Sequence, residues 1–327
     1  MNTFWTELSE MKMMKILSLF DGISCGMLAL QRAGIPVDEY HAFEIDKYAL
    51  AVSKKNYPEI IQHGDVFDGE YKQFKGFDIL MGGSPCTYWS VAKKYRETTT
   101  EGEGFRLFME FIRALHESRC KYFLYENNYS IHKNISAEIS VQLGVQPIMI
   151  DSALVSAQSR KRYYWTNIPN VHQPADKHIV VSDILEKGVV PLNDYKDKVR
   201  TIKAQYGKTS LANAVRDNDF GATMAAKPIR VGQINGGGQG QRVYSIHGKT
   251  VTMSANGGGE GAKTGLYKVD LPDGDYTIRK LTPIEAERAQ TLPDNYTEGI
   301  SNTQRYKCIG NAWTVDVIAH ILGGLAA

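Results

Sequence analysis

The stretch Phe77-Asp78-Ile79-Leu80-Met81-Gly82-Gly83-Ser84-Pro85-Cys86 joins a short apolar run to a glycine turn and a cysteine. The apolar run predicts a buried parallel strand, and the glycines after it allow the backbone to turn sharply. Pro85 fixes its own φ and favours an extended Ser84, which sets the direction of the Cys86 side chain. Because open α/β sheets carry their chemistry beyond the carboxyl ends of their strands, Cys86 is a candidate nucleophile. The alternative is a buried structural cysteine at a turn. This stretch alone does not distinguish the two roles, so the other motifs of the chain are needed.

Strand-like and helix-like segments alternate along the first half of the chain. Strands are expected at residues 15–20, 41–45, 77–81, 122–125, 147–155 and 162–166, with a short one before Gly64, and helices between them, including 105–118 and 131–143. This alternation predicts an α/β fold built on a doubly wound, mostly parallel, Rossmann-like sheet.

The pattern changes after Thr166. Glycine clusters lie at residues 235–238 and 256–259, and the β-branched and aromatic runs between them, 242–246 and 250–253, favour strands of a smaller, loop-rich domain. A linker is the alternative. Near the C-terminus, Thr282-Pro283-Ile284-Glu285 and residues 315–322 are typical of helices. We therefore expect an N-terminal extension (1–14), a first domain (15–166), a second domain (167–278) and a C-terminal return to the first domain (279–327).

The composition is that of an ordinary globular protein, with 327 residues, 43% hydrophobic and 23% charged residues, and a formal net charge of +2. A nucleic-acid partner is therefore compatible only with a local basic surface, such as Lys93-Lys94-Tyr95-Arg96. The four cysteines are widely spaced, which predicts neither a metal site nor a disulfide framework. No long apolar stretch or secretory signal is evident, so we expect a cytoplasmic protein that does not enter a membrane.

The loop Phe20-Asp21-Gly22-Ile23-Ser24-Cys25-Gly26 follows the first expected strand, and Glu44 ends the second. Glycine lets the backbone approach a ligand, and a carboxylate at this distance is suited to ribose hydroxyl groups. The G-x-G-x-x-G pattern of dinucleotide sites is absent, which favours a nucleoside-type cofactor without a pyrophosphate, such as S-adenosylmethionine. Asp65, after the third strand, adds a carboxylate for an adenine amino group or an ammonium group, although a lone aspartate there is also typical of a helix cap.

Glu126 ends the strand expected near the one that leads to Cys86, so a thiol and a carboxylate converge on one region. No histidine occupies a comparable position, which disfavours acyl transfer of the cysteine-protease type. On an extended strand Gln158, Arg160 and Arg162 share one face, since side chains alternate. The alternative for this basic segment is a solvated charge run.

In combination, these motifs resemble those of the cytosine-C5 DNA methyltransferases, from about Lys15 to the C-terminus. The matching motifs are Phe20-x-Gly22 (cofactor loop), Ser84-Pro85-Cys86 (nucleophile loop), Glu126-Asn127 (catalytic pair), Gln158-x-Arg160-x-Arg162, Arg279-x-Leu281-Thr282-Pro283-x-Glu285-x-x-Arg288-x-Gln290-x-x-Pro293 and Gly310-Asn311-Ala312. Each motif is modest alone, but all of them in this order are very specific.

The resemblance implies methyl transfer from S-adenosylmethionine to C5 of a cytosine flipped out of duplex DNA, through a bond between Cys86 and C6. It implies catalytic roles for Cys86, Glu126, Arg160 and Arg162. Cofactor contacts are implied for Phe20, Asp21, Gly22, Glu44, Ile45, Asp65, Val66, Pro85 and Asn311. DNA contacts are implied for Ser90, Gln158, Arg242, Gly257 and Gly258, and residues 167–278 take the place of the target recognition domain. The expected protein is a bacterial or phage monomer without a metal, with double-stranded DNA as its partner and a cognate restriction endonuclease as a candidate partner that acts separately.

Some positions depart from the family pattern. Asn128 stands where Val is usual, Thr87 where Gln is common, and Ile45 where an aromatic residue often follows the acid. These changes are expected to affect the pocket shape or turnover.

Other functions stay open beside this one: an RNA cytosine-C5 methyltransferase of the same fold, a catalytically silent DNA-binding homologue, or transfer of a different C5 substituent. The long region between Trp165 and Arg279 disfavours the RNA branch, whose target region is usually compact. The presence of Cys86, Glu126 and Arg162 disfavours a silent protein. The DNA recognition sequence does not follow from residue types, because base readout depends on loop geometry.

Overall fold

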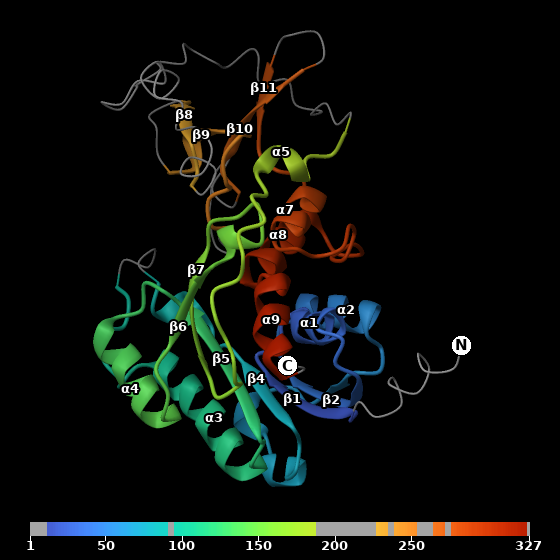
Figure 1. Cartoon of the computed structure of the whole chain (residues 1–327), viewed down its shortest axis with the longest axis vertical. Coiled ribbons are helices and arrows are strands. Elements are labelled where there is room, and N and C mark those ends of the chain that lie inside the picture. The colour runs from blue at the N-terminus through green and yellow to red at the C-terminus, as the bar shows by residue number, and fades with distance from the viewer. Residues whose placement is uncertain are drawn as a thin grey trace. The chain divides into compact units, whose positions relative to one another are not determined.

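The computed structural model describes residues 12–90, 95–187, 227–234, 239–253, 264–271 and 276–325. Their contacts divide the chain into two compact units, whose elements are labelled in Figure 1. The first unit contains the residues up to Ile150, Lys161–Gln173 and the stretch from Val315 onward. The second contains Asp151–Arg160 and Pro174–Thr314, so both units are built from discontinuous segments.

In the described part of the first unit, seven strands form one sheet in the order β3-β2-β1-β4-β5-β7-β6. The strands are β1 (Met14–Leu19), β2 (Val37–Phe43), β3 (Ile61–Gln62), β4 (Ile79–Gly82), β5 (Tyr122–Asn128), β6 (Ile148–Asp151) and β7 (Lys161–Thr166). β1 is parallel to β2 and β4, and β4 is parallel to β5, whereas β7 is antiparallel to β5. This mostly parallel sheet confirms the predicted α/β fold class.

The direction of winding reverses between β1 and β4. β2 and β3 extend the sheet from one side of β1, and β4 and β5 extend it from the other. Leu19 and Gly82 are register partners at the carboxyl ends of β1 and β4. A Cβ atom at Gly82 would lie 2.9 Å from the Leu19 carbonyl oxygen and 3.0 Å from the Phe111 ring, so this close packing requires glycine. The loops after β1 and β4 therefore start next to each other, at the point where open α/β sheets bind their ligands.

Helices cover both faces of this sheet (Figure 1). α3 (Glu103–Ser118) and α4 (Lys133–Leu143) lie on one face, and α1 (Cys25–Arg32), α2 (Lys47–Asn56) and α9 (Val315–Leu322) lie on the other. On α3 the buried residues Phe108, Phe111 and Ile112 have the spacing of one helix face. They join the core cluster that also contains Tyr125 of β5 and Trp165 of β7. Burial of this face fixes α3 against the strands that lead to the candidate site.

Two local expectations are wrong. Residues 158–162 do not form one extended strand, because β7 begins only at Lys161. Gln158 instead makes an isolated bridge to Thr250, and the Arg160 N–H donates to Asp151 Oδ1 at 2.8 Å. Residues 250–253 likewise contribute only that bridge, in place of the expected strand, since the Thr250 N–H and C=O groups pair with Ala157 and Ser159.

The second unit has a smaller sheet among its described residues, in the order β11-β10-β9-β8. Its strands and helices are α5 (Val181–Ile184), β8 (Arg230–Gln233), β9 (Arg242–Ser245), β10 (Leu266–Asp270), β11 (Tyr276–Arg279), α7 (Pro283–Ala289) and α8 (Asn302–Asn311). α7 begins with the expected cap. Thr282 Oγ1 accepts the Glu285 N–H at 3.2 Å, and Glu285 Oε2 accepts the Thr282 N–H at 2.8 Å. This reciprocal capping box explains why a helix starts at Pro283.

One stretch of the described residues, Asn302–Leu325, is long and apolar enough by length and composition to cross a membrane. It consists of α8, which carries Arg305 and Lys307, and of α9, whose apolar side chains are buried in the protein. A buried core helix passes the same test of length and composition. The apolar character of α9 is therefore explained by packing.

Candidate active site

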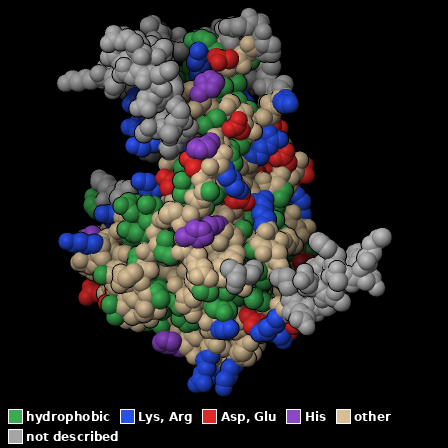
Figure 2. All heavy atoms as spheres, in the orientation of Figure 1, with side chains coloured by type: hydrophobic (Ala, Val, Ile, Leu, Met, Phe, Trp, Pro, Cys, Tyr) green, Lys and Arg blue, Asp and Glu red, His purple; other side chains and the backbone are tan. Residues whose placement is uncertain are grey.

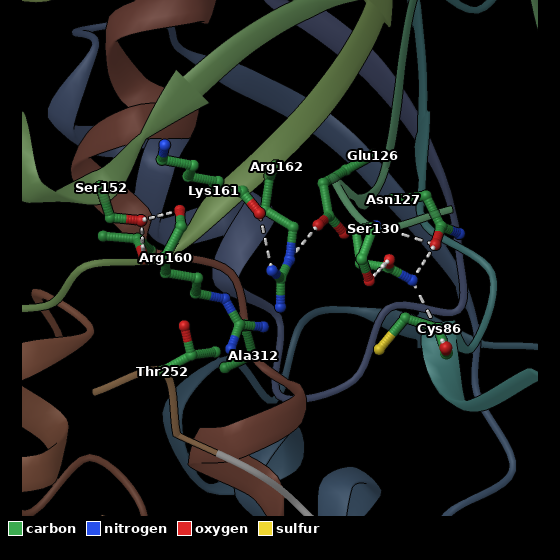
Figure 3. Close-up of polar contacts among 12 residues, drawn as sticks. Cys86, Glu126, Asn127, Ser130, Ser152, Arg160, Lys161, Arg162, Thr252 and Ala312 are labelled. Atoms are coloured by element: carbon green, nitrogen blue, oxygen red, sulfur yellow. Dashed lines mark hydrogen bonds and ion pairs between the residues drawn. The ribbon is translucent and has the colours of Figure 1, made fainter. Parts of the chain in front are cut away.

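Cys86 lies in the 3₁₀ turn Cys86–Tyr88, which follows β4 and is capped by Pro85. Its carbonyl oxygen accepts the N–H groups of Trp89 at 3.1 Å and Ser90 at 3.0 Å, which closes the turn. Cys25, Cys120 and Cys308 are buried, whereas Cys86 is free and partly exposed. In Figure 3 its sulfur is directed to the side on which Glu126 and Arg162 lie. Exposure and direction favour a reactive thiol over a structural cysteine.

Strand β5 holds the residue that precedes Pro85. The hydroxyl groups of Ser84 and Tyr125 lie 2.7 Å apart, and the Ser84 carbonyl accepts Asn127 Nδ2 at 3.1 Å. Burial raises the pKa of Tyr125 well above its usual range, so its hydroxyl stays neutral and keeps its proton for hydrogen bonding. The position of the nucleophile loop is therefore set by the neighbouring strand.

Glu126 of β5 and Arg162 of β7 form an ion pair, with Nε 2.9 Å from Oε1. The antiparallel register pairs Glu126 with Tyr164 and Asn128 with Arg162, so Glu126 and Arg162 are diagonal neighbours on one face. Arg162 Nη1 also donates to the Lys161 carbonyl at 2.8 Å, which fixes the guanidinium (Figure 3). A carboxylate is thus held near the loop of Cys86 by two strands.

Glu44 follows β2, and backbone N–H groups hold its carboxylate. Oε2 accepts from Gly22 at 2.8 Å, and Oε1 accepts from Ile45 at 2.8 Å and Asp46 at 2.7 Å. Burial raises the pKa of Glu44, and these hydrogen bonds partly oppose that rise. Because an ionised carboxylate accepts at about four positions, Glu44 keeps capacity for a ligand hydroxyl group.

The loop after β1 is strained, and a buried aspartate supports it. Phe20 and Ser24 adopt left-handed φ angles of 57° and 60°, which cost about 1–2 kcal/mol each in residues other than glycine. The Asp21 carboxylate points inward and accepts the hydroxyl groups of Ser18 at 2.7 Å, Ser24 at 2.5 Å and Tyr40 at 2.7 Å. Burial raises the pKa of Asp21, and the hydroxyl donors oppose that rise. The Asp21 side chain therefore stabilises the loop from the interior.

The remaining predicted cofactor residues of the first unit lie at the ends of β2 and β3. Ile45 is 69% exposed and follows Glu44, which places an apolar surface there. Asp65 Oδ1 accepts the Phe67 N–H at 3.0 Å, so this carboxylate also caps a short turn, as its alternative role suggested. Val66 is buried, and its carbonyl accepts the Tyr71 hydroxyl at 2.7 Å.

Comparison with known proteins settles the family. Residues 14–326 match the model of a family described as C-5 cytosine-specific DNA methylase. The chain belongs to this family. It is therefore an enzyme of the DNA cytosine-5 methyltransferase class, which confirms the resemblance that the motifs indicated.

Individual relatives of this methylase agree with the family match. Type II methyltransferase M.HhaI of Haemophilus parahaemolyticus is 29% identical over 328 residues, which cover 94% of this chain and 93% of that protein. Orphan methyltransferase M.Rho11sI of Bacillus phage rho11s is 29% identical over 80% of this chain and 62% of the phage protein. The solved structure of Entamoeba histolytica methyltransferase EhMeth has a TM-score of 0.68 at 16% identity, covering 96% of this chain and 98% of that one. At that identity the likeness supports the fold alone.

The methylase motif Gln158-x-Arg160-x-Arg162 is shared between the two units. Gln158 is buried in the second unit, where its amide contacts the Ala289 carbonyl and the Met253 N–H at 3.3 and 3.2 Å. Arg160, also buried there, donates to the carbonyls of Gly310 and Ala312, both at 3.2 Å. Only Arg162 joins Glu126 in the first unit. In this structure the first two side chains therefore hold backbone segments of the second unit together.

The described residues that were predicted to contact DNA belong to both units. Ser90 follows the Cys86 turn in the first unit, and Arg242 starts β9 in the second. Gly257 and Gly258 lie outside the described residues, as do Lys93 and Lys94 of the basic-aromatic segment. Asn311, predicted to bind the cofactor, is exposed at the end of α8 in the second unit. On the face shown in Figure 2, Lys and Arg side chains are interspersed with Asp and Glu, in line with the net charge of +2.

Sequence reasoning missed the role of Asn128 beside the nucleophile loop and the burial of Lys249 in the second unit. Asn128 was noted only as a departure, yet it contacts Asn127 and Cys86. Lys249 is fully buried and donates to the carbonyls of Ala153, Ser156 and Ile179. No local signal separates such a lysine from a surface one, because its partners lie far away in the sequence. Among the described residues no cluster of His, Cys, Asp or Glu is suited to hold a metal.

Proposed function

We propose that this methylase transfers a methyl group from S-adenosylmethionine to C5 of a cytosine flipped out of a specific double-stranded DNA sequence, through a covalent bond between Cys86 and C6. One observation carries the proposal. The Cys86 thiol, the Glu126 carboxylate and the Arg162 guanidinium come from the ends of neighbouring strands, with Glu126 and Arg162 held 2.9 Å apart. A nucleophile beside an oriented carboxylate is what attack on the cytosine ring requires.

In the proposed reaction the Cys86 thiolate forms a bond to C6 and breaks the C5–C6 double bond. Glu126 forms hydrogen bonds with N3 and the exocyclic amine of the base, and these favour a proton at N3 as the adduct forms. C5 becomes enamine-like and would take the methyl group as its bond to the sulfonium sulfur of the donor breaks, which leaves a neutral thioether. Loss of the C5 proton to a base then restores the double bond and expels Cys86. Because stacking shields C6, the base must first leave the duplex, at a cost of a few kcal/mol.

The residues around Glu44 fit the proposed cofactor. When bound, S-adenosylmethionine supplies an electrophilic methyl group. The Glu44 carboxylate, oriented by the Gly22 and Ile45 amides, would accept a ribose hydroxyl group, and exposed Ile45 and the strained Phe20 would offer apolar surface to the adenine. The other residues that we assign to this site are Asp21, Asp65, Val66, Pro85 and Asn311. Among them Asp21 acts through the loop that it supports.

We assign the DNA contacts to Ser90, Arg242, Gly257 and Gly258, and base orientation to Arg162 with support from Arg160. Gln158, predicted to contact DNA, is fully buried and hydrogen-bonded to Ala289 and Met253, so we assign it instead to support of the segments beside it. Residues 167–278 would then be the target recognition domain between two parts of the catalytic domain, 15–166 and 279–327. The relatives are named as a type II enzyme of Haemophilus and an orphan enzyme of a Bacillus phage, which supports a bacterial or phage origin. We further propose that the protein is cytoplasmic and acts as a monomer, with a cognate restriction endonuclease as a separate partner.

The first test is covalent trapping. The protein is mixed with S-adenosylmethionine and duplex DNA containing 5-fluorocytosine, in which C5 carries no proton to lose after methyl transfer. A denaturant-resistant protein–DNA adduct that requires both the cofactor and Cys86 is expected, and Cys86→Ala is the control. Sequencing the trapped DNA then identifies the target site. An adduct with fluorinated RNA but not with DNA would replace the DNA assignment by an RNA one, and no adduct with either would overturn the mechanism.

A further inference from the structure

We propose that Asn128 is a positioning residue for the Cys86 loop and that Ser130 orients its amide group. The proposal rests on the proposed function of Cys86, and it gives a role to one of the residues that depart from the family pattern. Asn128 lies at the end of β5 and is buried, so both ends of its amide need hydrogen-bond partners within the protein.

The first contact between Asn128 and the Cys86 loop runs through the side-chain amide of Asn127. Its Oδ1 accepts the Asn128 N–H at 2.9 Å and Asn128 Nδ2 at 3.2 Å. With two donors on the oxygen, the nitrogen end of Asn127 must face the other way, toward the Ser84 carbonyl at 3.1 Å. Asn128 thereby selects the amide orientation that lets Asn127 hold the residue before Pro85.

The second contact joins Asn128 directly to the Cys86 loop. Asn128 Nδ2 also points to the Cys86 carbonyl at 3.5 Å, a long hydrogen bond to an oxygen that already closes the nucleophile turn. The carbonyls of Ser84 and Cys86, on either side of Pro85, are thus contacted by successive asparagine side chains. The contact to the Cys86 carbonyl is marked in Figure 3. Rotation of the loop about Pro85 would break one contact or the other.

The third link orients Asn128 itself. Ser130 Oγ donates to Asn128 Oδ1 at 2.7 Å, so the nitrogen end of Asn128 must face Asn127 and Cys86. Ser130 is held in turn by Arg96, whose Nη1 donates to the Ser130 carbonyl at 2.5 Å. Donor and acceptor directions are therefore consistent from Ser130 to Ser84. A valine at position 128 would be similar in size but would remove the side-chain donor and acceptor, leaving only the backbone N–H on Asn127 Oδ1.

The test compares Asn128→Val, Ser130→Ala and the double variant with the full-length wild-type enzyme. Steady-state methyl transfer gives kcat and the KM values for DNA and S-adenosylmethionine. Hydrogen exchange without substrates gives the protection of the Trp89 and Ser90 amides, which bond to the Cys86 carbonyl. Ser130→Thr keeps the hydroxyl group, and Ser136→Ala in α4 is a control outside these contacts. Thermal unfolding of every variant checks that it folds.

We expect Asn128→Val to lower kcat about tenfold and to speed exchange of the two amides about tenfold, with the KM for S-adenosylmethionine within about twofold of wild type. Ser130→Ala should lower kcat about threefold and add nothing to Asn128→Val, because coupled residues are not additive. Ser130→Thr and Ser136→Ala should match wild type. Unchanged exchange in Asn128→Val, or additive losses in the double variant, would overturn the proposal. If the wild-type enzyme transfers no methyl group, the proposed function fails while the exchange data still test the positioning role.

Discussion

Arg162 Nε lies 2.9 Å from Glu126 Oε1, and the two side chains are only 11% and 12% exposed. The two residues are 36 positions apart in the sequence and meet only because β7 runs antiparallel to β5. A largely buried carboxylate without such a partner is costly, since little water remains to solvate it. The pair therefore serves the fold as well as the proposed chemistry, and its removal should affect both.

Replacing Arg162 with Met should slow methyl transfer about a hundredfold, because Glu126 loses the cation that orients it against the base. Single-turnover rates with saturating DNA and cofactor measure this loss. The matched control is Arg106→Met, which breaks the exposed pair between Arg106 and Glu103 on α3. That change should leave the rate within about twofold, since surface pairs contribute little. An Arg162→Met enzyme as fast as the control would remove the pair from the mechanism.

Glu44→Gln should weaken S-adenosylmethionine binding about tenfold at neutral pH, because a neutral amide is a poorer acceptor for ribose hydroxyl groups than a carboxylate. Burial raises the pKa of Glu44, so wild-type affinity should fall as the pH drops through this raised value, at a higher pH than for an exposed glutamate. Calorimetric titration over a pH series measures both effects. The affinity of Glu44→Gln should not fall as the pH drops. If its affinity depends on pH as that of wild type does, Glu44 is not the group whose protonation weakens binding.

Asp21→Asn should change how stability depends on pH. Burial raises the pKa of Asp21 in the folded state, so the folded protein holds this proton more tightly than the unfolded chain does. The contribution of Asp21 to the free energy of unfolding should therefore be largest at low pH and decline as the pH rises from about 4 through the raised value. Urea unfolding of wild type and Asp21→Asn over this range gives the difference. If wild type gains stability relative to the variant as the pH rises, the pKa of Asp21 is not raised on folding and the prediction is wrong.

Arg279→Met should destabilise the second unit by about 3–5 kcal/mol, because it leaves the fully buried Glu285 carboxylate without its cation. Arg279 Nη1 and Nη2 donate to the two oxygens of Glu285 at 2.6 and 2.7 Å, and Glu285 also completes the cap of α7. Denaturant unfolding measures the loss. The double change Arg279→Met with Glu285→Leu should recover part of it, and a double variant less stable than the single one would mean that the cap matters more than the charge.

Much of the candidate site follows from residue types alone. Gly82, Gly83 and Pro85 dictate a turn after a buried strand, and the reciprocal cap of Thr282 and Glu285 dictates where α7 begins. These features depend on neighbours within a few positions, so their physics is local. The order of the motifs was enough to indicate the family, because each motif combines such a local geometry with a reactive or charged side chain.

Other features depend on which strands and segments meet. The motif resemblance placed Asp21 among the cofactor contacts, whereas in the structure its carboxylate accepts the hydroxyl groups of Ser18 and Tyr40. Gln158 and Arg162 stand four positions apart in one motif, yet the first is buried in the second unit and the second pairs with Glu126. Burial of such polar side chains is a property of the assembled chain, so pattern and propensity alone do not predict it.

The sequence by itself determined the fold class, the turn that presents Cys86 and the family, because strand periodicity, glycine and proline act over short distances along the chain. Only the tertiary structure decided which carboxylate faces which cation and how Asn128 reaches the nucleophile loop. The reason is that sheet order and antiparallel register bring together residues far apart in sequence. Hydrogen-bond direction then selects one amide orientation among those that the isolated side chains allow.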